Sequence, residues 1–484
     1  MPAKKKTPRG IFALFPDTKA GKVALSAKKS THDFSVREKP LWQNQRNFGR
    51  SIPVKLPCRN TDLTLISFGR RGTWKIKDDK VADIQCSFEI HRLTGEILLY
   101  DRSPDASTVL LGEKSTAFWG SPRRVVVNDK INLQFGFPGS GVGGFQWTIT
   151  WAKNPPFPLI NGPRGPCGML PRTIWELPAD RSRSTTLHTK GISQAMRVLP
   201  RRLIATGLSS DVFEAIDIDS GGYVAVKYFR LPLTTWDLRP ELVRITKEIA
   251  RQSHVSFLHF FKSHVLEQNL TCQQPHIVEF IGAQQIPQTP ETPQTLKIIT
   301  SLKQGNITDL KEYFREDLSR INTLLHHMLQ ALDYLAVEGI TYCNVCPKNI
   351  LYTERPDGSY NYQLNNSSFA CIDRTNRLHP PNCWFVAPEL RGDLSRDHTL
   401  KAAVWSLFTT IVFTLDLGRI QGSCAKGSPI SIPDATYHAA KFFSDPIKAM
   451  AEPSPDARPT AGELLDQVFG GEGRAMPPHH KTLV

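Results

Sequence analysis

Two of the nine cysteines form a C-x-x-C pair, a spacing that can support redox chemistry or half of a metal site. The pair is Cys343 and Cys346. A tetrahedral metal site needs a second pair of Cys or His ligands, and the sequence offers no further C-x-x-C or H-x-x-x-H. The other cysteines are irregularly spaced, and an odd number in a long chain favours reduced thiols inside a cell. The spacing of the pair is therefore better explained by the segment that contains it.

That segment, residues 342–351, reads Y-C-N-V-C-P-K-N-I-L and resembles the catalytic loop of protein kinases, H-R-D-L-K-P-x-N-I-L. In that family the Asp accepts the proton of the substrate hydroxyl, and the Lys lies near the transferred phosphate. The resemblance puts Asn344 in place of the Asp and Cys346 in place of the Lys, with Tyr342 in place of the His. An amide cannot accept a proton as a carboxylate does. We therefore expect a loop that keeps its shape, including Asn349, and loses its catalytic groups.

A β-rich run that ends in V-A-V-K matches the kinase strand whose lysine pairs with nucleotide phosphates. The resemblance gives this role to Lys227 and makes Glu248 its expected acidic partner. Residues 205–212 stand in place of the glycine-rich loop, and only Gly207 of its glycines remains. Backbone contact with phosphate is therefore weakened, although ATP bound through Gly207, Lys227 and Glu248 remains a possible cofactor.

The metal-binding D-F-G position falls at Asn366, after an expected strand. By the resemblance, Asn349 and Asn366 would be the ligands for Mg²⁺. A neutral amide is a poorer ligand than a carboxylate for this hard cation, so we expect weak metal binding at best. Asp373 is the only spare acid nearby.

Motifs that support the kinase fold, as opposed to its chemistry, are better kept. Residues 387–389 read A-P-E and residues 458–460 read R-P-T. In kinases this Glu and Arg form a buried ion pair, which the resemblance assigns to Glu389 and Arg458. The resemblance covers about 270 residues and implies a bilobal α+β fold.

The N-terminal third resembles forkhead-associated (FHA) domains, β-sandwiches whose loops bind phosphothreonine. Gly69 and Arg70 match their G-R pattern, and Ser87 matches the Ser of S-R-x-H. A charge-assisted contact from Arg70 and a hydroxyl from Ser87 could hold a phosphate. The alternative is that both are ordinary loop and strand residues.

Periodicity predicts the elements that would position these residues. Short β-rich runs predict strands at 63–66, 74–76, 86–90, 97–100, 125–127, 145–151 and 223–229. Apolar residues at helical spacing predict helices at 319–337 and 402–417.

We expect a multidomain protein with an N-terminal all-β FHA-like sandwich and a C-terminal α+β bilobal kinase-like fold. The expected parts are a basic flexible tail (1–55), the sandwich (56–152), a Pro-rich linker (153–195), the kinase-like domain (196–470) and a second flexible tail (471–484).

A formal net charge of +15 favours acidic partners, and the basic residues are spread in pairs without a long block. The sequence has no run of about 18 apolar residues, and its start lacks the apolar core of a secretory signal. We therefore expect no membrane span and a location in the nucleus or cytoplasm.

Three functions remain open. The leading hypothesis is a pseudokinase signalling scaffold that binds an acidic or phosphorylated protein, similar to the degenerate FHA-kinase proteins of filamentous fungi. The second is an atypical ATP-dependent serine/threonine kinase that uses Lys227, Glu248 and Asn349. The third, less favoured, is nucleic-acid binding by the basic surface, which would weaken steeply with salt.

Overall fold

The computed structural model describes residues 10–26, 51–55, 63–119, 121–152, 196–207, 210–230, 274–286, 295–337, 342, 345–365, 383–390, 400–417, 420–421 and 432–475. The chain divides into two compact units. The first contains Met1–Asp180 together with Ala195–Arg202 and Glu214–Val224. The second contains Arg181–Gln194, Leu203–Phe213 and Ala225–Val484.

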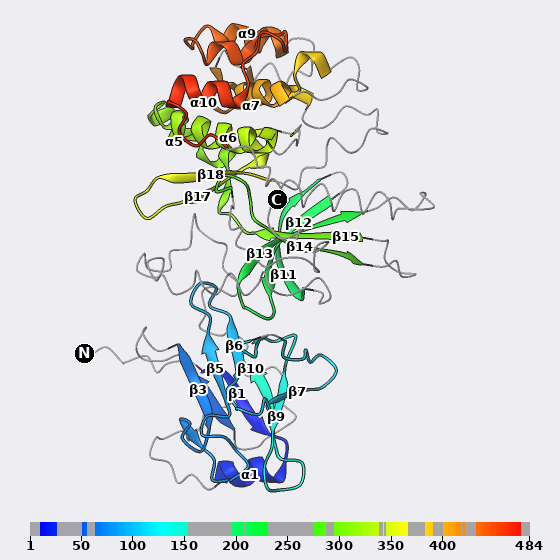
Figure 1. Cartoon of the computed structure of the whole chain (residues 1–484). Helices are drawn as coiled ribbons and strands as arrows, with labels where there is room; N and C mark the ends of the chain where they lie inside the picture. Colours follow the sequence, from blue (N-terminus) through cyan, green and yellow to red (C-terminus); the bar gives the residue numbers. More distant parts are fainter. Residues whose placement is uncertain are drawn as a thin grey trace, which may run out of the picture. The chain divides into compact units, whose positions relative to one another are not determined.

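The first unit is built on two sheets (Figure 1). One has the strand order β2-β1-β10-β9-β7, and the other has the order β4-β3-β5-β6-β8. The strands of the first sheet are β1 (Gly10–Pro16), β2 (Ile52–Lys55), β7 (Val109–Leu111), β9 (Gln134–Phe137) and β10 (Phe145–Trp151). Those of the second are β3 (Thr64–Gly69), β4 (Trp74–Lys75), β5 (Cys86–Ile90), β6 (Ile97–Asp101) and β8 (Arg124–Val127).

Large aromatic side chains fill the space between the two sheets. Phe12, Phe88, Phe135 and Trp147 have no exposed surface. The Phe88 and Phe135 rings meet edge to face with centroids 5.2 Å apart, a favourable arrangement of two π-systems. Along β10, buried and partly exposed residues alternate strictly, as expected for a strand with one face on the core. The predicted all-β sandwich is thus present.

The sandwich begins earlier than the sequence predicts. We expected a flexible tail up to residue 55, but β1 pairs antiparallel with β10, and Phe12 faces Trp151 in the register. Ile11 and Leu14 on β1 are fully buried. Helix α1 (Lys19–Ser26) follows directly. The run G-I-F-A-L-F-P was missed because it is an isolated apolar stretch inside a basic segment.

After the sandwich, a separate sheet starts with β11 (Val198–Thr206), β12 (Ser210–Asp217) and β13 (Tyr223–Arg230). With β14 (Phe280–Ile286) and β15 (Thr295–Ser301) they form a sheet of order β11-β12-β13-β15-β14. Each of the first three strands contributes residues to both units. A smaller sheet joins β16 (Gly305–Asn306), β17 (Ile350–Glu354) and β18 (Tyr360–Leu364).

Helices make up most of the remaining described chain. They are α5 (Lys311–Glu316), α6 (Arg320–Val337), α7 (Leu400–Leu415), α9 (Ile432–Ala440) and α10 (Ala461–Phe469). Helices α6 and α7 lie within two residues of their predicted bounds. Trp405 and Phe408 on α7 and Leu329 on α6 are fully buried in one core. A capping box between Thr460 and Glu463 starts α10.

The chain after α10 differs from the flexible tail predicted from residue 471. Arg474 forms an ion pair with Asp333 of α6, with 3.2 Å between Nε and Oδ2. The Ala475 amide donates to the same carboxylate at 2.9 Å. The folded region therefore extends at least to Ala475. Among the helices in the described ranges, none combines the length and apolar character needed to cross a membrane.

Candidate functional sites

The loop that resembles the kinase catalytic loop is held by its own backbone and by a tyrosine. Tyr342, the residue in place of the His, is 4% exposed. Its hydroxyl donates to the carbonyl oxygen of Asn365 at 2.6 Å. The Asn365 amide in turn donates to the Asn349 carbonyl at 2.8 Å. The structure thus brings Asn349 next to the residue that precedes Asn366, as the predicted alignment requires.

Cys346 stands where a phosphate-side lysine is expected, and it is 1% exposed. Burial raises the pKa of its thiol to about 11, although neighbouring backbone amides and Lys348 act in the opposite direction. Its carbonyl accepts from the Asn349 amide at 2.9 Å, in the short helical turn Pro347–Asn349. Cys346 is therefore a neutral core residue.

Helix α7 contacts the backbone of this loop through a threonine side chain. The Thr410 hydroxyl is within 3.3 Å of the Val345 carbonyl, and both residues are buried. Thr410 also donates to Ser406 one turn earlier at 2.7 Å. The loop is thus fixed by hydrogen bonds that do not depend on the side chains at the catalytic positions.

Lys227 lies on β13, as predicted, and its ammonium group is desolvated. Burial lowers the pKa of Lys227 to about 8, although the side chain as a whole is only partly buried. Its Nζ lies 4.6 Å from the centre of the Phe229 ring, two residues along the same strand. A lysine in this setting gains most from an anionic partner. Glu248, the predicted partner, lies outside the described residues, as do Asn344, Asn366 and Asp373.

Gly207 follows β11 at the start of a short turn to β12. Its amide donates to the Ser210 carbonyl at 2.7 Å, so this N–H is used within the hairpin. A longer glycine-rich loop would leave several amides free to face phosphate. The Gly207 amide therefore already has a protein acceptor.

The predicted Glu389–Arg458 ion pair is present and buried. Arg458 has no exposed surface, and its guanidinium meets the two carboxylate oxygens of Glu389 at 2.8 and 3.1 Å. The same guanidinium donates to the carbonyls of Lys401, Glu452 and Pro453. All of its donors thus face acceptors, which is the condition for a stable buried charge.

In the sandwich, Arg70 lies in the loop after β3. Its guanidinium is about half exposed and lies 3.1 Å from the Asp83 carboxylate, which also faces Arg71 at 3.6 Å. Gly69 permits this approach: a Cβ at this residue would lie 2.2 Å from the Asp83 carbonyl oxygen. Arg70 and Arg71 therefore project from a loop that is pressed against residues 82–84.

Gln85 fastens this loop to residues 103–108. Gln85 is fully buried, and its amide nitrogen donates to the hydroxyls of Ser107 at 2.9 Å and Thr108 at 3.2 Å. Its oxygen accepts from the Ala82 amide at 3.1 Å. Ala106, which directly precedes Ser107, takes a left-handed backbone conformation with φ of 55°. These contacts define one end of the sandwich, called here the loop end: residues 69–73, 82–85 and 103–108.

Ser87 differs from the predicted phosphate ligand in its surroundings. It is 3% exposed inside β5, and its hydroxyl donates to Glu89 at 2.6 Å and accepts from Arg102 at 3.3 Å. Arg70 and Ser87 thus have different partners. The sequence did not single out Asp83 or Gln85, because neither belongs to the patterns quoted for FHA domains and their roles arise from contacts across loops.

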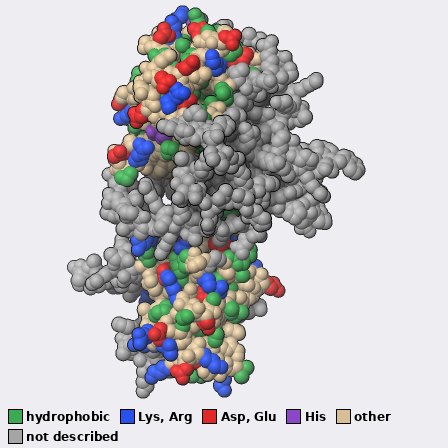
Figure 2. Space-filling view, viewed as in Figure 1, with side chains coloured by type: hydrophobic (Ala, Val, Ile, Leu, Met, Phe, Trp, Pro, Cys, Tyr) green, Lys and Arg blue, Asp and Glu red, His purple; other side chains and the backbone are tan. Residues whose placement is uncertain are grey.

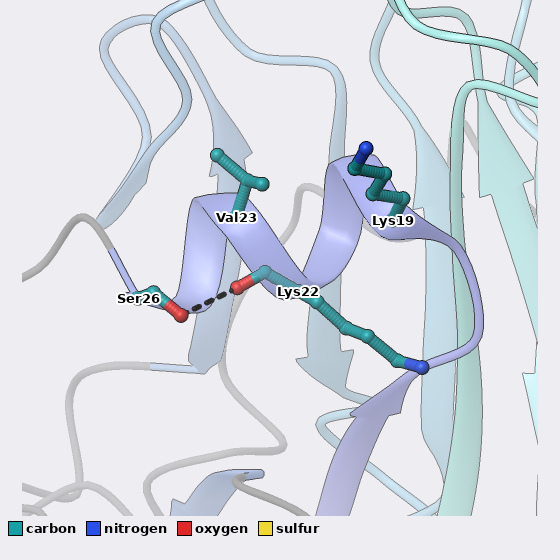
Figure 3. A pocket seen from close by; sticks show the side chains of 4 residues that line it. All are labelled: Lys19, Lys22, Val23 and Ser26. Atoms are coloured by element: carbon teal, nitrogen blue, oxygen red, sulfur yellow. Dashed lines mark hydrogen bonds between the residues drawn. The ribbon is translucent and has the colours of Figure 1, made fainter.

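A hollow in the surface lies elsewhere, against α1 (Figure 3). Lys19, Lys22, Val23 and Ser26 line a shallow space of about 410 Å³. The two lysine side chains do not converge, and Ser26 donates to the Lys22 carbonyl of its own helix. None of the predicted site residues lines this space.

No protein-family model matches the chain. The CBL-interacting protein kinase 22 of Oryza sativa subsp. japonica is 24% identical over 292 residues, which is 55% of this chain. The match spans 60% of that kinase's length. The crystal structure of Rad53 1-466 in complex with AMP-PNP overlaps 87% of this chain and 96% of its own, at 15% identity and a TM-score of 0.45. A TM-score of that size carries no argument by itself.

The similarity to a protein kinase agrees with the geometry of the C-terminal half. A five-stranded sheet precedes the helical region, the Val345 carbonyl of the catalytic-loop segment contacts Thr410 of α7, and the Glu389–Arg458 pair lies in the core. The predicted fold class is confirmed: an all-β FHA-like sandwich is followed by an α+β kinase-like fold.

Proposed function

We propose that this protein is a signalling scaffold of kinase-like fold in which phosphoryl transfer is lost. The observation that carries the proposal is the burial of Cys346. Phosphoryl transfer depends on positive charge and metal ions placed around the transferred group. At Cys346 the chain has a neutral thiol in its core, and the adjacent Tyr342 hydroxyl is bound to backbone.

Nucleotide binding without efficient transfer is the second candidate, and Lys227 favours it. Its pKa of about 8 means that an anion placed beside it would draw a proton onto the amine. ATP would be held through Lys227, and when bound it would place its triphosphate charge beside this desolvated amine. The residues fit ATP in part, because the Gly207 amide is already bonded within its turn.

We also propose that the loop end of the sandwich meets an acidic or phosphorylated protein inside the cell. Arg70 and Arg71 are the exposed donors there, and Asp83 competes for them. The buried thiols of Cys86 and Cys346 are free, which is consistent with a reducing compartment.

The deciding experiment is the thermal shift of the full chain with millimolar ATP, with and without Mg²⁺. Ligand at a hundred times its Kd stabilises the folded state by about 2.7 kcal/mol. A scaffold that binds no nucleotide shows no shift. A nucleotide-binding scaffold shows a shift that Lys227→Met removes and that Lys348→Met, an exposed lysine of the catalytic-loop segment, leaves intact.

Calorimetry identifies the site of any binding. If ATP lies beside Lys227, binding at a pH just above 8 takes up protons, since the phosphates raise the pKa of the amine. Measured heats then vary with the ionisation enthalpy of the buffer, and this variation disappears in Lys227→Met. Transfer of phosphate to a protein substrate by the wild-type chain, lost in Lys227→Met, would contradict the scaffold proposal.

A further inference from the structure

The first unit contains more than the sandwich. Residues Ala195–Arg202 and Glu214–Val224 belong to it, and they lie in or directly next to strands β11, β12 and β13. Their described residues, 196–202 and 214–224, are called here the hairpin segments. All contacts below lie within the first unit.

The hairpin segments cover apolar residues on the outer side of a sandwich sheet. Along β6, Ile97 and Leu99 face the core between the sheets, whereas Leu98 and Tyr100 belong to a separate cluster. Leu98 is 1% exposed in that cluster, and Ile216 of β12 is fully buried there. Val126 of β8 and Tyr223 complete it. The outer face of an antiparallel sandwich sheet usually meets water, so this sheet is buried on both sides for a specific reason.

One backbone hydrogen bond joins the edge strand of the same sheet to the hairpin segments, and one side-chain hydrogen bond joins the turn before β6 to them. Strand β8 is its last strand, so the outward amides of β8 would otherwise lack strand partners. The Val126 amide donates to the Ile218 carbonyl at 2.8 Å, and the Thr94 hydroxyl donates to the Gly221 carbonyl at 2.8 Å. Ile218 also packs into the main core of the sandwich. The hairpin segments thus supply bonds that the sandwich needs.

Buried ion pairs complete the contact. Arg201 of β11 meets Glu96 at 2.6 Å, with 22% and 10% of the two side chains exposed. Burial raises the pKa of the Glu96 carboxyl, and Arg201 opposes that rise. Arg197 pairs with Asp219 and lies 3.9 Å above the Trp119 ring. Removing one partner of such a pair leaves a buried charge and is costly.

We propose that the sandwich permanently braces the hairpin segments, so that it does not act as a module separable from them. The surface formed by β6, β8 and the 94–96 turn takes the hairpin segments of the same chain as its partner. This inference does not depend on the ligand of the loop end or on nucleotide binding.

The test uses the full chain with a protease site inserted into the Pro-rich segment 153–195. After cleavage, we expect the two pieces to co-elute as one species in size-exclusion chromatography at physiological salt. Two separately eluting, folded pieces from the wild-type sequence would overturn the proposal.

Charge exchange shows which contact holds the pieces. Glu96→Arg places two arginines together, and the cleaved pieces are expected to separate. The double variant Glu96→Arg, Arg201→Glu restores the opposite charges and should restore co-elution. Arg71→Glu, at the loop end, is the control and should not separate them. Separation that the double variant fails to reverse would show that the Glu96–Arg201 pair does not hold this surface.

A measurement on the uncleaved chain covers variants that fold poorly. In Arg201→Gln, amide exchange is expected to become faster in residues 124–127 and to stay unchanged in residues 145–151 of the other sheet. Unchanged exchange in 124–127 would contradict the brace.

Discussion

Arg458 is a buried charge whose contacts are structural and independent of the catalytic-loop segment. It satisfies its donors with one carboxylate and three backbone carbonyls, and none of these groups belongs to the catalytic-loop segment. Its aliphatic and guanidinium surface also lies beside Trp405, 5.2 Å from the ring centre. Selection for a stable fold is enough to keep it.

We predict that Arg458→Met lowers the free energy of unfolding of the second unit by about 3–5 kcal/mol, because Glu389 is left buried without its partner. Chemical denaturation measures this loss. Arg315→Met is the matched control, since Arg315 pairs with Glu312 on an exposed face of α5, where such pairs contribute about 0.2–1 kcal/mol. Equal losses in the two variants would show that the buried pair is not a structural anchor.

Single residues also mark the limit of what the sequence could predict. The Glu389–Arg458 pair was predictable because both residues sit in motifs with a fixed structural role. Ser87 was not, because a motif match cannot tell a loop hydroxyl from one inside a strand. Asp83 was missed because its effect on Arg70 depends on a loop packed against a distant turn.

Helix α6 packs against the sheet that contains β18 through a pair of stacked histidines. The rings of His276 and His327 lie 3.9 Å apart at an angle of 17°. The Tyr362 amide donates to Nδ1 of His327 at 3.3 Å, so this nitrogen must carry no proton. Burial lowers the pKa of His276 to about 4 and that of His327 to about 3, with further effects from Arg355 and His326.

We predict that the second unit loses stability as the pH falls from about 6.5 towards about 4. In this range the unfolded chain takes up protons on both histidines, while the folded chain keeps them neutral, so protonation favours unfolding. The loss is roughly 1.4 kcal/mol for each unit by which a pKa is lowered. Chemical denaturation at a series of pH values measures it.

His327→Asn keeps an acceptor for the Tyr362 amide but cannot titrate, so it should flatten the dependence on pH. His438→Asn, on the exposed side of α9, should leave the slope unchanged. An equal slope in wild type and His327→Asn would contradict the assignment.

Helices and strands were predictable where one spacing of apolar residues dominates the local sequence. Apolar residues at helical spacing placed α6, and a continuous apolar run placed α7. Strands β1 and β2 were missed because they are isolated β-rich stretches inside a basic N-terminal segment. Their membership follows from the pairing of β1 with the distant β10 and of β2 with β1, which local patterns do not encode.

The net charge of +15 is offset locally on much of the described surface. In the sandwich, Arg102 pairs with Glu89 and Arg123 pairs with Asp101. Figure 2 shows Lys and Arg side chains interspersed with Asp and Glu over the described residues of this face. Such a surface favours local recognition of an acidic group over uniform binding along a nucleic acid.

We predict that Arg70→Ala with Arg71→Ala weakens binding of a phosphothreonine peptide to the full chain by about tenfold or more, through loss of charge-assisted hydrogen bonds. Asp83→Asn should strengthen binding, because the carboxylate no longer competes with phosphate. Fluorescence anisotropy measures both effects. Arg92→Ala, in the exposed turn after β5, is the control.

A different pattern would favour the nucleic-acid hypothesis. An oligonucleotide would displace the peptide, affinity would fall steeply with salt, and Arg92→Ala would weaken binding as much as the loop-end variants. That pattern would mean that the overall charge, and not the loop end, selects the partner.

The two buried thiols have a practical consequence. Cys86 lies in β5 of the sandwich, where burial and the Asp101 carboxylate raise the pKa well above its usual range, and Cys346 lies in the second unit. The thiolate is the nucleophile that attacks an alkylating reagent, so burial protects each sulfur twice: it excludes the reagent and it keeps the thiol protonated. Each can react only when its own surroundings open. The labelling rates of Cys86 and Cys346 therefore report local opening of the sandwich and of the second unit separately, without an engineered probe.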